Sequence, residues 1–222
     1  MKRKVTAALE AWAAERNKKP LVLFGARQTG KTTSVLDFGA TRYQSVVHVD
    51  FVRQPSLKAA FERSLDPKDI IQLLAALLRR SIEPEGTLLF FDEVQECDQA
   101  IASLKYFRQD APEYDVIAAG SLLGVHVARQ GSFPVGYVDM LTMHPMDFEE
   151  FCWAMGEERA FDVVRASLAS RESCPLHDHM MELYRDYLLV GGMPEVVSLW
   201  SEGASLERVR RAQRDISTAY VA

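Results

Sequence analysis

The chain has 222 residues, of which 48% are hydrophobic and 26% are charged, and its formal net charge at pH 7 is −5. These proportions are typical of a globular protein with one sizeable core, or with a core and a small second lobe. The negative charge argues against a surface that binds nucleic acid non-specifically over its whole extent, although it leaves room for local basic patches.

The three cysteines, Cys97, Cys152 and Cys174, are few, odd in number and widely spaced. Their spacing fits neither a disulfide framework nor a metal-binding pair, which indicates a reducing cytoplasm. Glu10 and Glu15 interrupt the apolar part of the N-terminus, so the sequence predicts no secretory leader. No stretch approaches about 18 uninterrupted apolar residues, so no association with a membrane is expected.

The chain is predicted to begin with a helix, a strand and a second helix. Apolar residues at helical spacing predict the first helix over residues 3–18, which Pro20 ends. The apolar run Leu21–Phe24 predicts a short buried strand. The second helix is expected over residues 33–38, because Gly39 follows.

The turn between that strand and the second helix carries a phosphate-binding pattern. Residues 25–32 match G-x-x-x-x-G-K-[ST]. A strand that enters a Gly-rich turn and then a helix directs backbone N–H groups and the positive end of the helix dipole at one anion. Gly25 and Gly30 permit close backbone approach, while Lys31 can reach the β- and γ-phosphates and the Thr32 hydroxyl can bind Mg²⁺. The predicted nucleotide-binding residues are Gly25, Ala26, Arg27, Gln28, Thr29, Gly30, Lys31, Thr32 and Thr33.

Strands and helices continue to alternate as far as residue 143. Further strands are predicted at 46–51, 87–91, 116–119 and 137–143, with helices at 70–78 and 98–109. This alternation predicts the α/β class, a parallel sheet with helices on both faces. From Phe148 onward the patterns are helical only, which predicts a separate helical lobe.

Two carboxylates follow the apolar run Leu88–Phe91, at the carboxyl end of a predicted strand. In a doubly wound sheet this edge is where ligands bind. Asp92 would hold the Mg²⁺ that bridges the β- and γ-phosphates, and Glu93 would accept a proton from a water aimed at the γ-phosphorus. Because a small-molecule kinase has no use for a hydrolytic base here, the pair favours an ATPase. Ser121, after a later strand, would bond the γ-phosphate or the attacking water, or else cap the next helix.

Together these motifs resemble the AAA+ ATPases, and more closely a prokaryotic AAA-type ATPase family that usually carries a C-terminal domain of unknown function. The matching stretches are residues 25–33, 91–95, 119–124, 144–151 and 190–195. The resemblance implies a five-stranded parallel sheet of order 5-1-4-3-2, followed by a helical lid that closes over the nucleotide. It also implies ATP as the nucleotide, because no guanine-reading motif is present.

The resemblance assigns roles to individual residues. It gives Lys31 and Thr32 the Walker A roles, Asp92 and Glu93 the Walker B roles, and Ser121 the sensor role. Lys31, Glu93 and Ser121 are thus the predicted catalytic residues, and Thr32 and Asp92 the predicted Mg²⁺ ligands. The expected domains are a P-loop ATPase core over residues 1–155 and a helical lid over 156–222, with a further effector domain either missing or separate.

Three functions remain open at this stage. The first is a Mg²⁺-dependent ATPase coupled to an attached or partner module. The second is an ATP-loaded assembly switch with little turnover, and the third is a nucleic-acid-remodelling ATPase. Arg129 is a candidate arginine finger, with a surface arginine as the alternative, and the chain is a candidate homo-oligomer. The third function rests on basic stretches such as the one near the C-terminus: Arg208, Arg210, Arg211 and Arg214.

The histidines and the last predicted helix have structural interpretations. His48 and His144 stand alone and are interpreted as structural. His177 and His179 are two residues apart on a predicted helix, so their side chains face different sides. A helical apolar stripe runs to the end of the sequence: Leu206, Val209, Ala212, Ile216 and Tyr220. Without a further domain this stripe is expected to fray, to pack back on the lid or to drive self-association.

Overall fold

The computed structural model describes residues 1–121 and 133–221. The chain forms two compact units. The sheet unit is Val5–Met143, and the helical unit combines Met1–Lys4 with His144–Ala222. The polypeptide therefore passes between the units twice, once after Lys4 and once after Met143.

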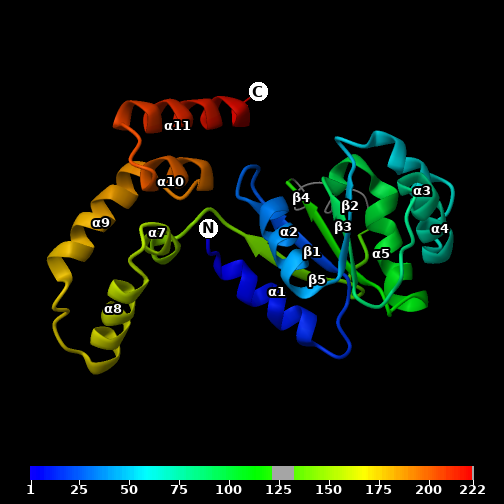
Figure 1. Ribbon diagram of the computed structural model, residues 1–222, viewed down its shortest axis with the longest axis horizontal. Helices are drawn as coiled ribbons and strands as arrows, with labels where there is room; N and C mark the ends of the chain where they lie inside the picture. Colours follow the sequence, from blue (N-terminus) through cyan, green and yellow to red (C-terminus); the bar gives the residue numbers. More distant parts are fainter. Residues whose placement is uncertain (122–132, 222) are drawn as a thin grey trace. The chain divides into compact units, whose positions relative to one another are not determined.

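The sheet unit is built on five parallel strands (Figure 1). They are β1 (Leu21–Gly25), β2 (Ser45–Asp50), β3 (Thr87–Asp92), β4 (Asp115–Gly120) and β5 (Asp139–Met143). Their spatial order is β2-β3-β4-β1-β5, which is the predicted order 5-1-4-3-2 read from the other edge. The predicted fold class and topology are thus confirmed.

Helices cover both faces of this sheet (Figure 1). They are α1 (Lys4–Ala14), α2 (Lys31–Arg42), η1 (Pro55–Lys58), α3 (Ala59–Glu62), α4 (Pro67–Leu78), η2 (Val94–Glu96) and α5 (Asp98–Asp110). Side chains alternate along a strand, so Leu88 and Phe90 pack in the core with α1 and α2. Leu89 and Phe91 pack in the opposite core with α3, α4 and α5. All four are fully buried, as expected for a strand covered on both faces.

Helix α2 does not end where the sequence pattern predicts. Gly39 lies inside the helix, which continues to Arg42, and Tyr43 N donates to Gly39 O over 2.9 Å. A Cβ atom at position 39 would stand 2.7 Å from Val46 Cγ2 and 3.1 Å from Leu88 Cδ2. The prediction of a helix stop was wrong because this glycine serves close packing on β2 and β3, which offsets the roughly 1 kcal/mol that glycine costs in a helix.

The helical unit contains α7 (Phe148–Ala154), α8 (Glu158–Ser170), α9 (His177–Val190), α10 (Pro194–Ser201) and α11 (Leu206–Val221). Val209, Ala212 and Ile216 of α11 are buried in the same core as Val196 and Val197 of α10. The middle of the apolar stripe therefore packs back on its own unit, one of the three outcomes expected, whereas Leu206 and Tyr220 at its ends are exposed. Among the residues described, no helix combines the length and apolar character needed to cross a membrane.

The first residues of the chain fasten onto the start of α7 through a buried ion pair. Arg3 Nε lies 3.1 Å from Glu150 Oε1, and these side chains are 7% and 6% exposed. Arg3 also donates to His144 O over 2.8 Å. Glu150 completes a capping box with Asp147 at the start of α7. The same carboxylate therefore serves both the helix cap and the N-terminal segment.

We expect Glu150→Gln to lower the free energy of unfolding of the helical unit by about 3 kcal/mol, because it removes the negative charge that pairs with the buried Arg3 guanidinium. Glu158→Gln is the matched control. Its partner Lys2 lies 3.1 Å away, but the two side chains are 57% and 48% exposed, so this change should cost less than about 1 kcal/mol. Urea unfolding followed by tryptophan fluorescence measures both. Equal effects of the two changes would contradict a structural role for the buried pair.

Candidate active site at the carboxyl edge of the sheet

The loop between β1 and α2 has the geometry that an anion-binding turn needs. A Cβ atom at Gly25 would stand 2.3 Å from Met143 O of the neighbouring strand, so only glycine fits there. Gly30 has φ 91° and caps α2, and Thr29 Oγ1 donates to Ala26 O over 2.9 Å inside the turn. The first N–H groups of α2 have no acceptor within the helix, which leaves them for a ligand.

Lys31 lies across this loop. Its Nζ donates to Gly25 O over 2.9 Å and to Ala26 O over 2.7 Å, and the residue is only 7% exposed. Burial lowers the pKa of the Lys31 ammonium, while the carboxylates of Glu93 and Asp92 act in the opposite direction. Phosphate oxygens are stronger acceptors than these neutral carbonyls, because a bond between ammonium and phosphate is charge-assisted on both sides.

Thr32 and Asp92 are in contact although they are 60 residues apart in the sequence. Thr32 Oγ1, on the first turn of α2, donates to Asp92 Oδ2 over 2.7 Å. Asp92 is the last residue of β3 and is 2% exposed, and its Oδ1 accepts from Glu93 N over 3.0 Å. A hydroxyl and a carboxylate oxygen in contact are oxygen donors of the kind that Mg²⁺ takes in nucleotide sites. These residues therefore fit such an ion.

Glu93 leaves the strand in a left-handed conformation, with φ 53°. Its Oε2 accepts a hydrogen bond from the Gln95 amide. The Gln95 Oε1 accepts in turn from Ser121 N, at the end of β4, over 3.3 Å. Gln95 thus links the carboxylate of Glu93 to the neighbouring strand end, a contact that the sequence pattern did not predict.

The side-chain hydroxyl of Ser121 is buried at this edge of the sheet. Its Oγ is the one buried side-chain oxygen or nitrogen that lacks a hydrogen-bond partner in the part of the chain that the structure describes. A buried hydroxyl without a partner costs stability unless a ligand satisfies it. This is a site where a ligand oxygen or a water would gain a bond.

Other predicted residues line the outer surface of the loop or fall outside the description. Ala26, Arg27 and Gln28 are exposed on the turn, and Thr33 is exposed on α2. Gln28 has a positive φ of 61°, a conformation that residues other than glycine rarely adopt. Arg129 lies outside the described residues, as do residues 122–124 of the matching stretch 119–124.

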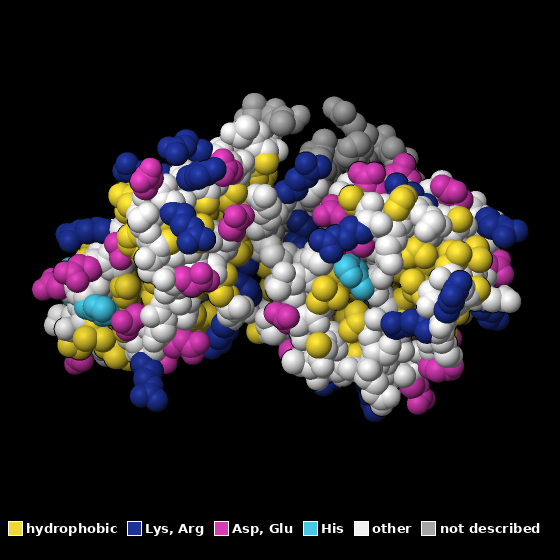
Figure 2. Space-filling model, turned by 45° about the horizontal axis from the view of Figure 1, so that its top comes forward, with side chains coloured by type: hydrophobic (Ala, Val, Ile, Leu, Met, Phe, Trp, Pro, Cys, Tyr) yellow, Lys and Arg dark blue, Asp and Glu magenta, His cyan; other side chains and the backbone are white. Residues whose placement is uncertain are grey.

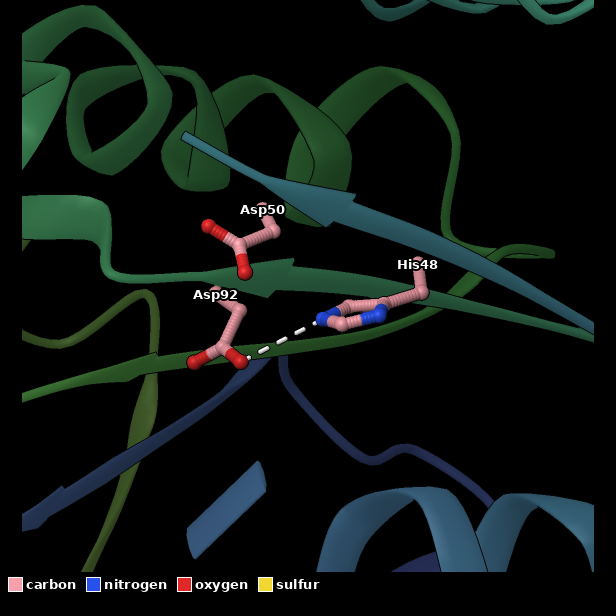
Figure 3. A group of neighbouring side chains, drawn as sticks. All are labelled: His48, Asp50 and Asp92. Carbon is pink, nitrogen blue, oxygen red and sulfur yellow. Dashed lines mark hydrogen bonds and ion pairs between the residues drawn. The ribbon is translucent and has the colours of Figure 1, made fainter. Parts of the chain in front are cut away.

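Two further residues at this edge were not predicted as part of the site. Figure 3 shows His48 and Asp50 of β2 beside Asp92 of β3. His48 Nε2 lies 3.2 Å from Asp92 Oδ2, and Asp50 pairs in register with Asp92. Asp50 Oδ1 accepts from Val52 N and Arg53 N over 2.9 Å each. The sequence signal that could have grouped His48 and Asp50 is their separation by two residues along a strand, which places both side chains on one face.

Comparison with known proteins gives the family and the fold. Residues 17–152 match a protein-family model described as an AAA domain. The structure is similar to the Walker-type ATPase PABY2304 of Pyrococcus abyssi, with a TM-score of 0.57 and 14% identity over 99% of this chain and 73% of that one. It is also similar to Drosophila ORC bound to DNA, with a TM-score of 0.54 and 15% identity over 94% and 62% of the two chains.

A third similar structure is PCH-2 of C. elegans, with a TM-score of 0.53 and 10% identity over 95% of this chain and 68% of that one. The search of curated proteins returned no match. At these low identities the solved structures show the fold alone. This chain spans less than two thirds of the length of the Drosophila chain.

Proposed function

The chain belongs to the AAA domain family, in agreement with its resemblance to AAA+ P-loop ATPases, and on that premise we propose that it is a Mg²⁺-dependent ATPase coupled to an effector or partner module. The observation that carries the proposal is the convergence of Thr32, Asp92, Glu93 and Lys31 at one edge of the sheet. The Thr32 hydroxyl donates to Asp92 over 2.7 Å. The carboxylates of Glu93 and Asp92 both raise the pKa of the buried Lys31 ammonium, against the effect of burial.

The loop residues bind the triphosphate in this proposal. Lys31 exchanges its bonds to Gly25 O and Ala26 O for oxygens of the β- and γ-phosphates. The N–H groups of the turn and of the first turn of α2 direct their partial positive charge at the same oxygens. Thr32 and Asp92 would hold the Mg²⁺, which would neutralise charge on the phosphate oxygens.

Glu93 is the proposed general base. A water attacks the γ-phosphorus, its proton passes to a Glu93 carboxylate oxygen, and the bond from phosphorus to the β–γ bridging oxygen breaks. Gln95 orients this carboxylate through its amide, and Ser121 donates its unpaired hydroxyl to a γ-phosphate oxygen or to the water. Basal turnover should be slow as long as no arginine finger acts, because such a residue is worth about 10³–10⁵ in related enzymes.

Steady-state assays with ATP and GTP on the purified chain test this proposal. We expect Mg²⁺-dependent release of phosphate from ATP, and less from GTP, because the resemblance favours adenine. Binding of ATP without measurable turnover would favour the assembly switch. Light scattering with and without ATP then tests for a homo-oligomer, which the switch requires.

A nucleic-acid-remodelling ATPase is the second candidate, and one observation favours it. Arg208, Arg210, Arg211 and Arg214 are all exposed on α11. Glu207 and Asp215 share that helix, however, and on the face in Figure 2 basic and acidic side chains are interspersed over both units. The DNA bound in the similar Drosophila structure belongs to that protein. Stimulation of ATP hydrolysis by DNA, lost when the four arginines are changed to glutamine, would support this candidate.

Ser121→Ala should separate catalysis from stability. Loss of one hydrogen bond to the transition state, worth about 1.4 kcal/mol, lowers turnover about tenfold. The nucleotide-free protein should be no less stable, because a buried unpaired hydroxyl is removed. Ser103→Ala is the control: its buried Oγ donates to Ala100 O over 2.8 Å, so this change should cost stability and leave turnover intact. Melting curves and turnover rates of both variants decide the matter, and full activity of Ser121→Ala would remove the sensor role.

A further inference from the structure

The ends of β2 and β3 bring together an imidazole and two carboxylates. His48, Asp50 and Asp92 each offer one ligand atom, and these atoms all lie within 4.8 Å of one another. Figure 3 shows the imidazole and both carboxylates directed into the same space. His48 and Asp50 are two residues apart on β2, so they lie on one face of the sheet, and Asp50 pairs with Asp92 of β3. The register of the two strands therefore fixes the arrangement of the three residues. We propose that these three residues form a mixed nitrogen–oxygen centre that binds late first-row divalent metals, such as Co²⁺ and Ni²⁺, more tightly than Mg²⁺.

The distances suit a single ion. Ligands on opposite sides of an octahedral ion stand about 4.2 Å apart, because each lies about 2.1 Å from the metal. Atoms that already lie within 4.8 Å reach such positions by small side-chain rotations. His48 is also held in place, because its ring stacks on Phe90 with centroids 4.9 Å apart and planes 10° from parallel. The imidazole is thus oriented before any ion arrives.

The burial and charge of the site favour a cation. Asp92 is 2% exposed and Asp50 is 9% exposed, so two carboxylates are withdrawn from water at one edge of the sheet. Backbone N–H groups satisfy one oxygen of each: Asp50 Oδ1 accepts from Val52 N and Asp92 Oδ1 accepts from Glu93 N. Asp92 Oδ2 faces His48 Nε2 and the Thr32 hydroxyl. A divalent ion at this oxygen would replace two hydrogen-bond partners with a metal–carboxylate bond.

The donor set decides which ion is preferred. Mg²⁺ prefers oxygen ligands only, whereas an imidazole raises affinity along the series from Mn²⁺ to Ni²⁺. A site made of Thr32 and Asp92 alone would favour Mg²⁺, and the addition of His48 shifts the preference. An imidazole would bind the ion through its Nε2 lone pair, with a proton on Nδ1. This inference extends the proposed function, since it assigns the metal selectivity of the site that holds Thr32 and Asp92.

The test uses the nucleotide-free full chain with Co²⁺ and Mg²⁺ as probes. Calorimetric titration should show that His48→Gln weakens Co²⁺ binding about 10- to 100-fold, the usual effect of disturbing a metal site. Binding of Mg²⁺ should change by less than about threefold, because Mg²⁺ gains little from an imidazole. His144→Gln, at an exposed histidine of the helical unit, is the matched control and should leave both affinities unchanged. Equal weakening for both ions in His48→Gln would overturn the inference, because His48 would then only position Asp92.

A second readout does not depend on the folding of any variant. In proton NMR of the wild-type chain with less than one equivalent of Co²⁺, a directly bound imidazole gives a hyperfine-shifted, exchangeable N–H signal. We expect this signal in the wild type and in His144→Gln, and its loss in His48→Gln. Its absence from the wild type would overturn the inference. A wild-type chain that shows the signal but no stabilisation by Mg-ATP would retain the metal site and refute the proposed ATPase, so the two failures are distinguishable.

Discussion

Lys31→Ala should abolish most of the thermal stabilisation that Mg-ATP gives this chain. At a ligand concentration 100 times Kd, binding adds about 2.7 kcal/mol to the stability of the folded state. For a chain of this size that is roughly 5–10 °C in melting temperature. The variant lacks the ammonium that would neutralise phosphate charge, and the backbone dipoles that remain are partial charges only.

The measurement compares each variant with its own nucleotide-free form, because Lys31 also bonds two carbonyls of the loop. Lys68→Ala is the control, since this lysine is exposed on α4. It should keep the full shift. A shift in Lys31→Ala as large as in the wild type would remove the phosphate-binding role of the loop.

Glu93→Gln should lower ATP turnover by about 10²–10⁴, the range that a positioned general base contributes. The amide retains the shape of the side chain and can still accept from Gln95, but it cannot take a proton from water. The thermal shift with Mg-ATP should therefore remain. Phosphate release and thermal shift, measured on the same preparation, separate hydrolysis from binding.

Glu96→Gln is the matched control for this change. Glu96 is exposed on the same short turn, 3.6 Å from Lys58, and should have no effect on turnover. Undiminished hydrolysis by Glu93→Gln would place the base elsewhere. If the wild type and the variant were equally slow, the assembly switch would be the better interpretation.

Much of the sheet unit could be predicted because local sequence and tertiary structure agree there. The apolar run from Leu88 to Phe91 predicts a strand covered on both faces, and all four side chains are buried. The loop from Gly25 to Thr32 could be located by spacing alone, since a turn between a strand and a helix needs glycine at fixed positions. The strand order required the resemblance to a known family.

Gly39 could not be predicted correctly from local rules. Glycine after an apolar helical pattern usually marks a helix end. Here the nearest atoms of Val46 and Leu88 decide its role, and these come from strands that follow later in the chain. The information lies in packing across elements, which no window of sequence contains.

The polar contacts around Asp92 were hidden for a related reason. Alternation along β2 places His48 and Asp50 on one face, but it does not say which strand lies next to them. The parallel pairing of Asp50 with Asp92 supplies that neighbour. Gln95 reaches Glu93 and Ser121 only because Glu93 adopts a left-handed conformation, a backbone choice that its residue type does not favour.

The ion pair between Arg3 and Glu150 has a consequence for synthesis of the chain. Its partners are separated by 147 residues, so Arg3 is synthesised well before the helix to which it bonds. At about 5–20 residues per second, that interval is roughly 7–30 s. During this interval Arg3 cannot form its bond with Glu150, so the N-terminal segment cannot adopt its final packing. If the chain were cleaved after Met143, the released part of the helical unit would lack Met1–Lys4. Those residues would have to be supplied as a separate peptide or joined to the unit by circular permutation.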